Sequence, residues 1–266
     1  MAELSVRRPA LKYFGGKWSL AKWVIGHLPE HRLYVEPFCG AASVLLRKPA
    51  SKVEVINDVS SDVVNFFRVA RESGGRLLED LRLTPYAEDE FRACVEASDD
   101  PVERARRFFV RSWQGFSGGS CPRSHRGFRR YHGRSIAGEF KGAVENVAAL
   151  TERLRAVTIE NLDWSVVLEK YDRLDAVFYV DPPYLQRVRA EGRYDKGYGV
   201  HEMADGESHM RLIDRLEGLR GAVVLSGYAD PMYDLRLAGW ERQEKRVSGL
   251  QNRGRTEVLW IKRGTA

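Results

Sequence analysis

Short apolar segments alternate with stretches of helical periodicity in the outer thirds of the chain, and this alternation constrains the fold more than any other feature. It is typical of a parallel sheet covered by helices. The 266 residues are enough to bury a large core. We expect an α/β fold with a mostly parallel sheet of about seven strands, over Leu33 to Val35, Val53 to Ile56, Val157 to Glu160, Ala176 to Val180, Ala222 to Ser226, Glu241 to Val247 and Glu257 to Ile261.

The middle of the chain interrupts the strand series. From Asp62 to about Arg111 the apolar residues follow helical periodicity, beginning with Val63, Phe66 and Phe67. Residues 114–135 are rich in glycine, serine and arginine, which is typical of a loop. We therefore predict a sheet domain formed by residues 1–65 and 146–266, and an inserted, mostly helical subdomain formed by residues 66–145.

Basic charge is concentrated in this insertion. The whole chain has a formal net charge of +6, whereas residues 101–141 contain nine arginines and one lysine against two glutamates, a local charge of +8. Aromatic residues such as Phe116 and Phe128 are interleaved with the arginines. This combination suits a polyanion with bases that can stack, so the insertion is a candidate nucleic-acid-binding region. The alternative is an ordinary solvated basic face.

The tetrapeptide Asp181-Pro182-Pro183-Tyr184 directly follows the apolar run Ala176 to Val180. In open parallel sheets, ligands bind beyond the carboxyl ends of the strands, where this segment is expected. The prolines fix the local backbone, so a carboxylate and a peptide carbonyl form a rigid acceptor cluster. Such a cluster can accept both hydrogens of an exocyclic amino group, while the tyrosine offers a face to a planar base. The alternative is a plain turn followed by a surface tyrosine.

A second segment, Val35-Glu36-Pro37-Phe38-Cys39-Gly40-Ala41-Ala42-Ser43, is predicted to be a strand, a glycine turn and the start of a helix. Such a turn lets a ligand approach the backbone closely, which favours a nucleotide-like cofactor near Glu36, Phe38 and Gly40. The next strand ends in Asn57-Asp58, where α/β cofactor folds place an acid on ribose hydroxyls. Close helix packing at the turn and a helix cap at Asp58 are the alternatives. The Gly16-Lys17 pair lacks P-loop spacing.

These segments, in this order, resemble the Dam-type family of adenine-N6 DNA methyltransferases, which use S-adenosylmethionine. The resemblance covers nearly the whole chain and implies a Rossmann-like methyltransferase sheet. It rests on the Lys12 to Lys17 block, the glycine turn, Asp58, the inserted region, Asp163-Trp164, Asp181 to Tyr184, Val224 to Ser226 and Arg255 to Leu259. By the same resemblance, Tyr13, Lys17, Asp58, Asp163 and Asp181 join the turn residues as cofactor-binding candidates.

Two positions depart from the family pattern. Tyr13 stands where the family often has tryptophan, which keeps an aromatic wall. Ala42 occupies a glycine position of the turn, and we expect its methyl group to lie close to the cofactor.

The resemblance implies methyl transfer to the exocyclic amine of adenine, a poor nucleophile because its lone pair is delocalised into the ring. Asp181 and the carbonyl of Pro182 would accept the two amino hydrogens and stabilise the positive charge that develops on the nitrogen, without a metal or a covalent intermediate. The adenine must leave the duplex, and stacking on Tyr184 offsets part of that cost. The predicted catalytic residues are Asp181, Pro182, Pro183 and Tyr184.

The insertion supplies the candidate contacts to double-stranded DNA, because arginine is the best donor to guanine edges. The segment Gly115-Phe116-Ser117-Gly118 is similar to the family segment that contacts the duplex near the target. Phe116 either wedges into the space left by the flipped base or packs on Trp113. The predicted DNA-binding residues are Arg111, Phe116, Arg123, Arg126, Arg129, Arg130 and Arg134.

Several other classes of protein are disfavoured. Three cysteines, Cys39, Cys94 and Cys121, lack the number and spacing of a disulfide framework or a zinc site, and His125 and His132 add no established ligand pattern. We therefore expect no metal. Because no apolar run is long enough to span a bilayer, we expect no membrane partner and a cytoplasmic location, in a bacterial nucleoid or a phage-infected cell. We favour a monomer.

Two other functions remain open. The protein could methylate another planar amine, such as cytosine N4 or an RNA base. Family members that act on cytosine often have serine or asparagine at the first position of the tetrapeptide, so Asp181 favours adenine. It could also be a DNA-binding protein that has lost methylation, an alternative that Ala42 keeps open.

Overall fold

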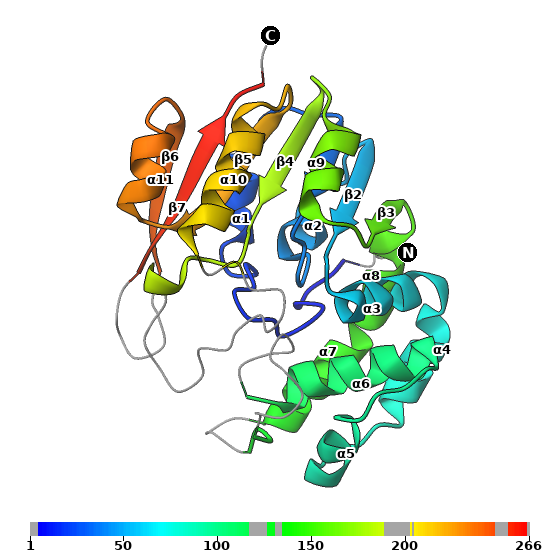
Figure 1. Ribbon diagram of the computed structural model, residues 1–266. Coiled ribbons are helices and arrows are strands. Elements are labelled where there is room, and N and C mark those ends of the chain that lie inside the picture. Colours follow the sequence, from blue (N-terminus) through cyan, green and yellow to red (C-terminus); the bar gives the residue numbers. More distant parts are fainter. Residues whose placement is uncertain are drawn as a thin grey trace.

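The computed structural model describes residues 5–116, 127–130, 135–188, 203, 205–247 and 255–264. Its centre is a seven-stranded sheet in the order β3-β2-β1-β4-β5-β7-β6, in which β7 runs antiparallel to its neighbours β5 and β6 and the other pairs are parallel (Figure 1). The strands are β1 (Leu33–Glu36), β2 (Val53–Asn57), β3 (Val157–Glu160), β4 (Ala176–Val180), β5 (Ala222–Tyr228), β6 (Glu241–Val247) and β7 (Arg255–Lys262). The predicted Rossmann-like, mostly parallel sheet is confirmed, including all seven strand segments.

Helices cover both faces of this sheet. They are α1 (Ala21–Ile25), α2 (Ser43–Arg47), α3 (Ser61–Glu72), α4 (Gly74–Arg82), α5 (Glu88–Ala93), α6 (Pro101–Gln114), α7 (Ile136–Glu145), α8 (Val147–Leu154), α9 (Trp164–Tyr171), α10 (Gly206–Glu217) and α11 (Pro231–Arg236), with a short 3-10 helix at Gln186–Val188. Within the described residues, none of these helices combines the length and the apolar character needed to cross a lipid bilayer.

The two faces of the sheet follow from the alternation of side chains along each strand. On one face, Tyr34 and Val177 pack with α1, α2, α3, α6 and α8. On the other face, Val35 and Phe178 pack with α9, α10 and α11. The strands β1 and β4 are buried along their whole length, as expected for parallel strands covered on both sides.

The helical insertion shares its core with the sheet. Helices α4 to α7 gather at one end of the molecule (Figure 1), and α3 connects them to the sheet. The expected boundary at residue 66 falls inside α3, and Phe66, Phe109 and Phe140 belong to the same hydrophobic core as Tyr34 and Val177. The insertion therefore shares one hydrophobic core with the sheet domain, because α3 packs on both α6 and α8.

Candidate active site

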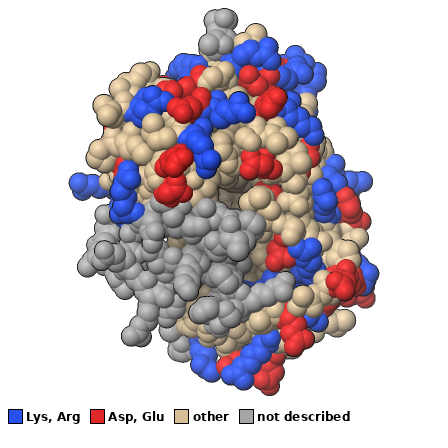
Figure 2. Space-filling model, viewed as in Figure 1, with Lys and Arg blue, Asp and Glu red and all other residues tan. Residues whose placement is uncertain are grey.

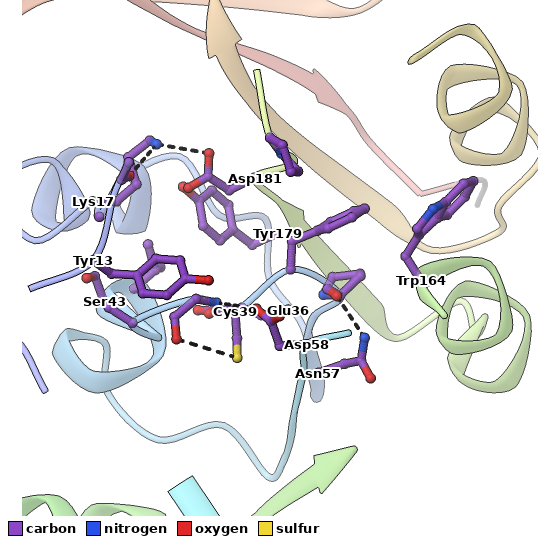
Figure 3. Close-up of a pocket in the computed structure, with 18 of the residues that line it drawn as sticks. Tyr13, Lys17, Glu36, Cys39, Ser43, Asn57, Asp58, Trp164, Tyr179 and Asp181 are labelled. Atoms are coloured by element: carbon purple, nitrogen blue, oxygen red, sulfur yellow. Dashed lines mark hydrogen bonds and ion pairs between the residues drawn. The ribbon is translucent and has the colours of Figure 1, made fainter. Parts of the chain in front are cut away.

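A cavity lies at the ends of the adjacent strands β1 and β4. From β1 the strand order continues through β2 to one edge of the sheet, and from β4 it continues through β5 toward the other edge. Open α/β sheets bind ligands outside the carboxyl ends of the strands at this switch point. Both predicted motifs lie at this cavity, since the glycine turn follows β1 and the Asp181 segment follows β4. The lining comes from five segments: residues 13–17, 36–44 without Ala42, 57–59, Asp163 with Trp164, and Tyr179, Asp181 and Pro183, together with Met203 (Figure 3).

The glycine turn depends on two residues in the left-handed backbone region. Gly40 has φ +48°, and Ala42, which precedes α2, has φ +49°. The amide of Ala42 donates to the carbonyl of Cys39 at 2.6 Å, which closes the turn. Ala42 is fully buried in the core and is not among the residues that line the cavity, so the structure gives no support to our expectation that its methyl group lies close to the cofactor.

Asp58 holds the glycine turn in place. Its Oδ2 accepts from the amide of Gly40 at 2.9 Å, and its Oδ1 accepts from the amide of Ser60 at 2.9 Å. The neighbouring Asn57 donates to the carbonyl of Pro37 at 2.9 Å. The ends of β1 and β2 are therefore linked by side chains, and Asp58 also lines the cavity where the predicted cofactor role requires it (Figure 3).

Glu36 lines the cavity and supports helix α2 by accepting a hydrogen bond from its backbone. It is 2% exposed, and its Oε1 accepts from the Tyr34 hydroxyl at 2.6 Å and from the amide of Leu45 at 2.8 Å. Burial raises the pKa of Glu36 to about 7, and the nearby charge of Asp181 adds to the shift. Glu36 is thus a buried acid that titrates near neutral pH.

Aromatic side chains form two walls of the cavity. Tyr13 lies so close to Gly40 that a Cβ atom there would approach its ring to 3.0 Å. Phe38 stacks on Trp164, with ring centroids 6.3 Å apart. Asp163 lines the cavity and also caps α9, because its side chain accepts from the amide of Ser165. The predicted cofactor candidates therefore meet around one cavity.

Lys17 and Asp181 form an ion pair at the edge of the cavity (Figure 3). The Lys17 Nζ lies 2.9 Å from Asp181 Oδ1 and donates to the carbonyl of Gly15 at 2.9 Å. Only 7% of the Lys17 side chain and 17% of the Asp181 side chain are exposed. Burial raises the pKa of Asp181 to about 6, although the positive charge of Lys17 opposes the shift. The carboxylate is therefore mostly ionised at neutral pH.

Tyr184 turns its hydroxyl toward β5 and β7. The hydroxyl donates to Glu257 and lies 3.2 Å from the hydroxyl of Ser226. The ammonium of Lys17 lies over the ring, 4.7 Å from its centroid, and Tyr228 meets the ring in an edge contact. A base stacked on Tyr184 would thus use the ring face away from Lys17. Pro182 and Pro183 are buried beside it.

Sequence reasoning assigned no role to several residues of the site. Trp164, Asn57, Ser43 and Tyr179 line the cavity, and Glu257 contacts Tyr184 behind it. Asn57 at the end of β2 and Glu257 in β7 are polar residues in otherwise apolar segments, so the sequence showed both as exceptions to the strand pattern. Nothing in the sequence showed that β7 lies next to β5, which brings Glu257 to the site.

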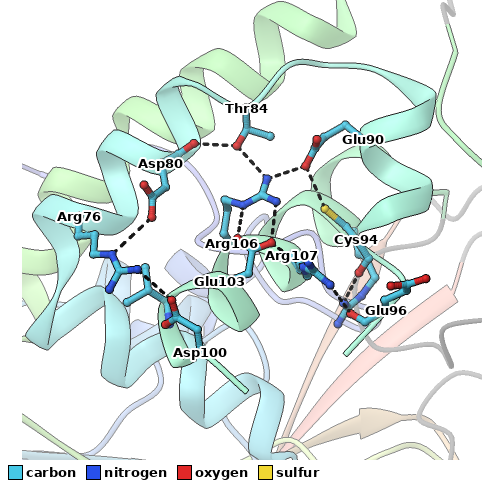
Figure 4. A network of polar contacts seen from close by, with 12 residues as sticks. Arg76, Asp80, Thr84, Glu90, Cys94, Glu96, Asp100, Glu103, Arg106 and Arg107 are labelled. Carbon is cyan, nitrogen blue, oxygen red and sulfur yellow. Dashed lines mark hydrogen bonds and ion pairs between the residues drawn. The ribbon is translucent and has the colours of Figure 1, made fainter. Parts of the chain in front are cut away.

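Much of the basic block is neutralised inside the helical region. Arg106 contacts Glu103 and Glu90, and Arg107 contacts Glu103, within the polar network of Figure 4. Arg104 pairs with Asp62 at 2.7 Å. Because Glu90 and Asp62 lie outside residues 101–141, the local charge of +8 overstated the field of this region. On the face shown in Figure 2, the described basic and acidic side chains are interspersed.

The predicted DNA contacts divide into three groups. The first group is largely buried, which argues against direct contact with DNA. The Arg111 side chain is 10% exposed, donates to the carbonyl of Cys94 and lies 3.6 Å from Asp62. Arg129 is 15% exposed and pairs with Glu139, so it also holds the helices together. Arg130 and Phe116 are exposed, although Arg130 contacts Glu88. Outside the described residues lie Arg123, Arg126 and Arg134, with the disfavoured metal candidates Cys121, His125 and His132.

Comparison with known proteins gives consistent matches. The model of the D12 class N6 adenine-specific DNA methyltransferase family matches residues 13–199. A DNA adenine methylase of Vibrio cholerae is 26% identical over 185 residues, covering 67% of this chain and 65% of that protein. The enzyme of the same name from Escherichia coli K12 is 30% identical over 118 residues, covering 42% of each chain. The one from Salmonella typhi is 28% identical over 189 residues, covering 66% of this chain and 65% of the relative.

The chain thus spans about 65% of the length of the Vibrio and Salmonella relatives. A solved rRNA methylase from Streptococcus thermophilus aligns over 92% of this chain and 94% of its own, with 9% identity and a TM-score of 0.37, too low a likeness to support an argument. The family model, in contrast, covers most of the sequence and includes residues 13–17 of the first block, the glycine turn and the Asp181 segment. The chain therefore belongs to the D12 class N6 adenine-specific DNA methyltransferase family.

Proposed function

We propose that the protein transfers a methyl group from S-adenosylmethionine to the N6 amino group of an adenine flipped out of double-stranded DNA. The position of Asp181 carries this proposal. Its largely buried carboxylate stands at the end of β4 and lines the same cavity as the glycine turn after β1. A cofactor held against the turn and a base amine held by Asp181 would meet in that cavity.

The residues of the cavity fit the cofactor. Tyr13, Phe38 and Trp164 supply aromatic walls for a planar purine, and Asp58 supplies a carboxylate beside the turn. The Ser43 hydroxyl is buried in the lining and has no hydrogen-bond partner among the described residues, so a polar ligand can satisfy it. When bound, S-adenosylmethionine supplies a methyl group activated by a positively charged sulfur.

The chain supplies the acceptors for the target base. Asp181 and the carbonyl of Pro182 are proposed to accept the two hydrogens of the adenine amine, which localises the nitrogen lone pair and stabilises the charge that develops on it. Although burial raises the pKa of Asp181 to about 6, this value is still below neutral pH. Its carboxylate is therefore mostly ionised and can act without prior loss of a proton. Tyr184 offers the remaining ring face for stacking.

DNA binding is assigned to the helical region and the segments next to it. Arg130 and Phe116 remain candidates there because they are exposed. Arg123, Arg126 and Arg134 remain candidates from the sequence. A duplex DNA substrate would place the protein in a bacterial cytoplasm or a phage-infected cell.

Transfer of tritiated methyl from S-adenosylmethionine to duplex DNA tests the proposal directly. We expect N6-methyladenine among the hydrolysed nucleosides. The variant Asp181→Ala should lose transfer and keep salt-sensitive duplex binding, because Asp181 lines the cavity and is not one of the arginines proposed to contact DNA. Full turnover in Asp181→Ala would refute the assigned role.

The product also separates the alternatives. N4-methylcytosine or labelled RNA would identify another planar amine as the substrate. Salt-sensitive DNA binding by the wild type without label transfer to DNA of several sources would identify a binding protein that has lost methylation.

A further inference from the structure

Glu257 is a buried acid at the start of the apolar part of strand β7. It is 2% exposed and is followed by Val258, Leu259 and Trp260, which are fully buried. A carboxylate is seldom kept in such a place unless nearby donors compensate its charge. The family motif that suggested the catalytic residues gave Glu257 no role, so its contacts have to explain it.

Among the described residues, the side chain of Glu257 contacts Tyr184, Ser226 and Lys17. Its Oε1 accepts from the Tyr184 hydroxyl and from the Ser226 hydroxyl, the latter at 2.9 Å. The same oxygen lies 3.6 Å from Lys17 Nζ. Glu257 therefore touches both the tyrosine of the catalytic tetrapeptide and the ammonium that pairs with Asp181.

Two buried acids thus share one ammonium. Lys17 Nζ is 2.9 Å from Asp181 Oδ1 and 3.6 Å from Glu257 Oε1, a difference of 0.7 Å. With Asp181 and Glu257 ionised, these three side chains carry a net charge of −1. Without the charge of Glu257, Lys17 and Asp181 would form a neutral pair, and the three side chains would present no net negative charge to a positively charged reacting centre.

The amine of the base competes with Lys17 for Asp181. A carboxylate oxygen that lies 2.9 Å from an ammonium in an ion pair is already engaged, so the base amine must displace or share that contact. Lys17 is 7% exposed, and water cannot readily replace the lost partner. A second anion within 4 Å gives the ammonium another partner without exposing it to solvent.

We propose that Glu257 is a positioning residue for methyl transfer: it takes over the Lys17 ammonium when Asp181 turns to the amine of the target base. The inference rests on the proposed function. Glu257 acts through Lys17 and Tyr184 and touches neither reactant.

In the part of the chain that the structure describes, the other groups that face Asp181 do not supply this second anion. Glu36 faces it from β1, but its Oε1 accepts from Tyr34 and from the Leu45 amide. Tyr179 on β4 and Tyr184 face it with neutral hydroxyls. Burial keeps the pKa of both tyrosines well above the ordinary value, so neither contributes a negative charge at neutral pH.

The variant Glu257→Gln tests the charge at constant size. We expect kcat for methyl transfer to fall roughly tenfold while KM for DNA and for S-adenosylmethionine changes less than about threefold, the pattern of an interaction used in the reaction step. In the protein without ligands, the carbon-13 carboxyl resonance of Asp181, assigned by its loss in Asp181→Asn, should titrate about one pH unit lower than in the wild type. The direction follows because removing a like charge favours the ionised form.

Two matched variants separate charge from packing. Ser226→Ala removes a neutral donor to Glu257 and keeps the charge, so the Asp181 midpoint should stay near the wild-type value. Glu257→Asp keeps the charge on a shorter side chain, so it should restore the midpoint and part of kcat. Circular dichroism and thermal unfolding establish that each variant is folded. If Glu257→Gln does not fold, Glu257→Asp and Ser226→Ala, which both keep the charge, still test the packing alternative: a shifted Asp181 midpoint in either would contradict the positioning role, and wild-type midpoints in both would support it.

The outcomes distinguish this inference from the proposed function. Wild-type kcat and midpoint in Glu257→Gln, or equal losses in Glu257→Gln and Glu257→Asp, would overturn the positioning role while an active wild type leaves the methyl-transfer proposal standing. A wild type that transfers no methyl to adenine would refute the proposed function and, with it, the role in turnover. In that case the titration still shows whether Glu257 and Asp181 are coupled.

Discussion

Gly40 and Ala42 are a natural pair for measuring what the glycine turn contributes. Both have a positive φ, but only Gly40 lines the cavity, and only Ala42 has a side chain. Replacing Gly40 by alanine adds a Cβ atom in the left-handed region, which costs about 1 to 2 kcal/mol. Fewer conformations of the unfolded chain offset about 0.4 to 1 kcal/mol of that cost. We expect Gly40→Ala to lower the free energy of unfolding by about 1 kcal/mol.

The added atom also meets the aromatic wall. It would lie 3.0 Å from Cδ1 and 3.1 Å from Cε1 of Tyr13, so the half-buried ring has to move by a few tenths of an ångström. Because this ring is proposed to contact the cofactor, the dissociation constant for S-adenosylmethionine should rise roughly fivefold, equivalent to about 1 kcal/mol. Urea unfolding measures the first effect, and isothermal titration calorimetry measures the second.

Ala42→Gly is the control. It relieves about 1 to 2 kcal/mol of backbone strain, loses about 0.8 kcal/mol of buried methyl and adds freedom to the unfolded chain, so its stability should stay within about 1 kcal/mol of the wild type. Its cofactor affinity should not change, because residue 42 does not line the cavity. Unchanged stability and affinity in Gly40→Ala, or weaker cofactor binding in Ala42→Gly, would refute this account of the turn.

Two further predictions concern buried charge and the basic region. For Glu36→Gln, the pKa of about 7 in the fold lies above the usual 4.5, so the contribution of Glu36 to stability is complete below pH 4.5 and is lost as the pH rises through 7. The variant should therefore gain about 3 kcal/mol relative to the wild type between pH 4.5 and 7 in urea unfolding, and a pH-independent difference would contradict the buried state of the acid. Arg111→Ala should lower the free energy of unfolding by about 2 kcal/mol, because it loses the contacts to Asp62 and Cys94. Arg130→Ala should change the free energy of unfolding by less than about 0.5 kcal/mol. It should reduce the salt dependence of duplex binding by about one charge. Equal effects of the two arginine variants on stability would show that burial does not separate their roles.

The sequence by itself determined the local elements and the edge of the sheet where the site lies. Apolar runs such as Ala176 to Val180 identify strands because a parallel strand is buried on both faces, and all seven expected strands are present. The glycine turn and the Asp181 segment each follow a strand directly. Since the carboxyl ends of parallel strands lie at one edge of the sheet, their proximity followed from the strand pattern.

The tertiary structure alone decided which charges meet. Lys17 reaches Asp181, Glu257 reaches Tyr184, and Asp62 neutralises Arg104, although each pair is far apart in the sequence. Composition counts charges along the chain, but an ion pair depends on which elements the topology brings within a few ångströms of each other. The same reason explains why the sequence predicted neither the burial of Arg111 nor the core that α3 shares with the sheet. Helical periodicity shows that a face is apolar, whereas only the packing of α3 on α6 shows what that face covers.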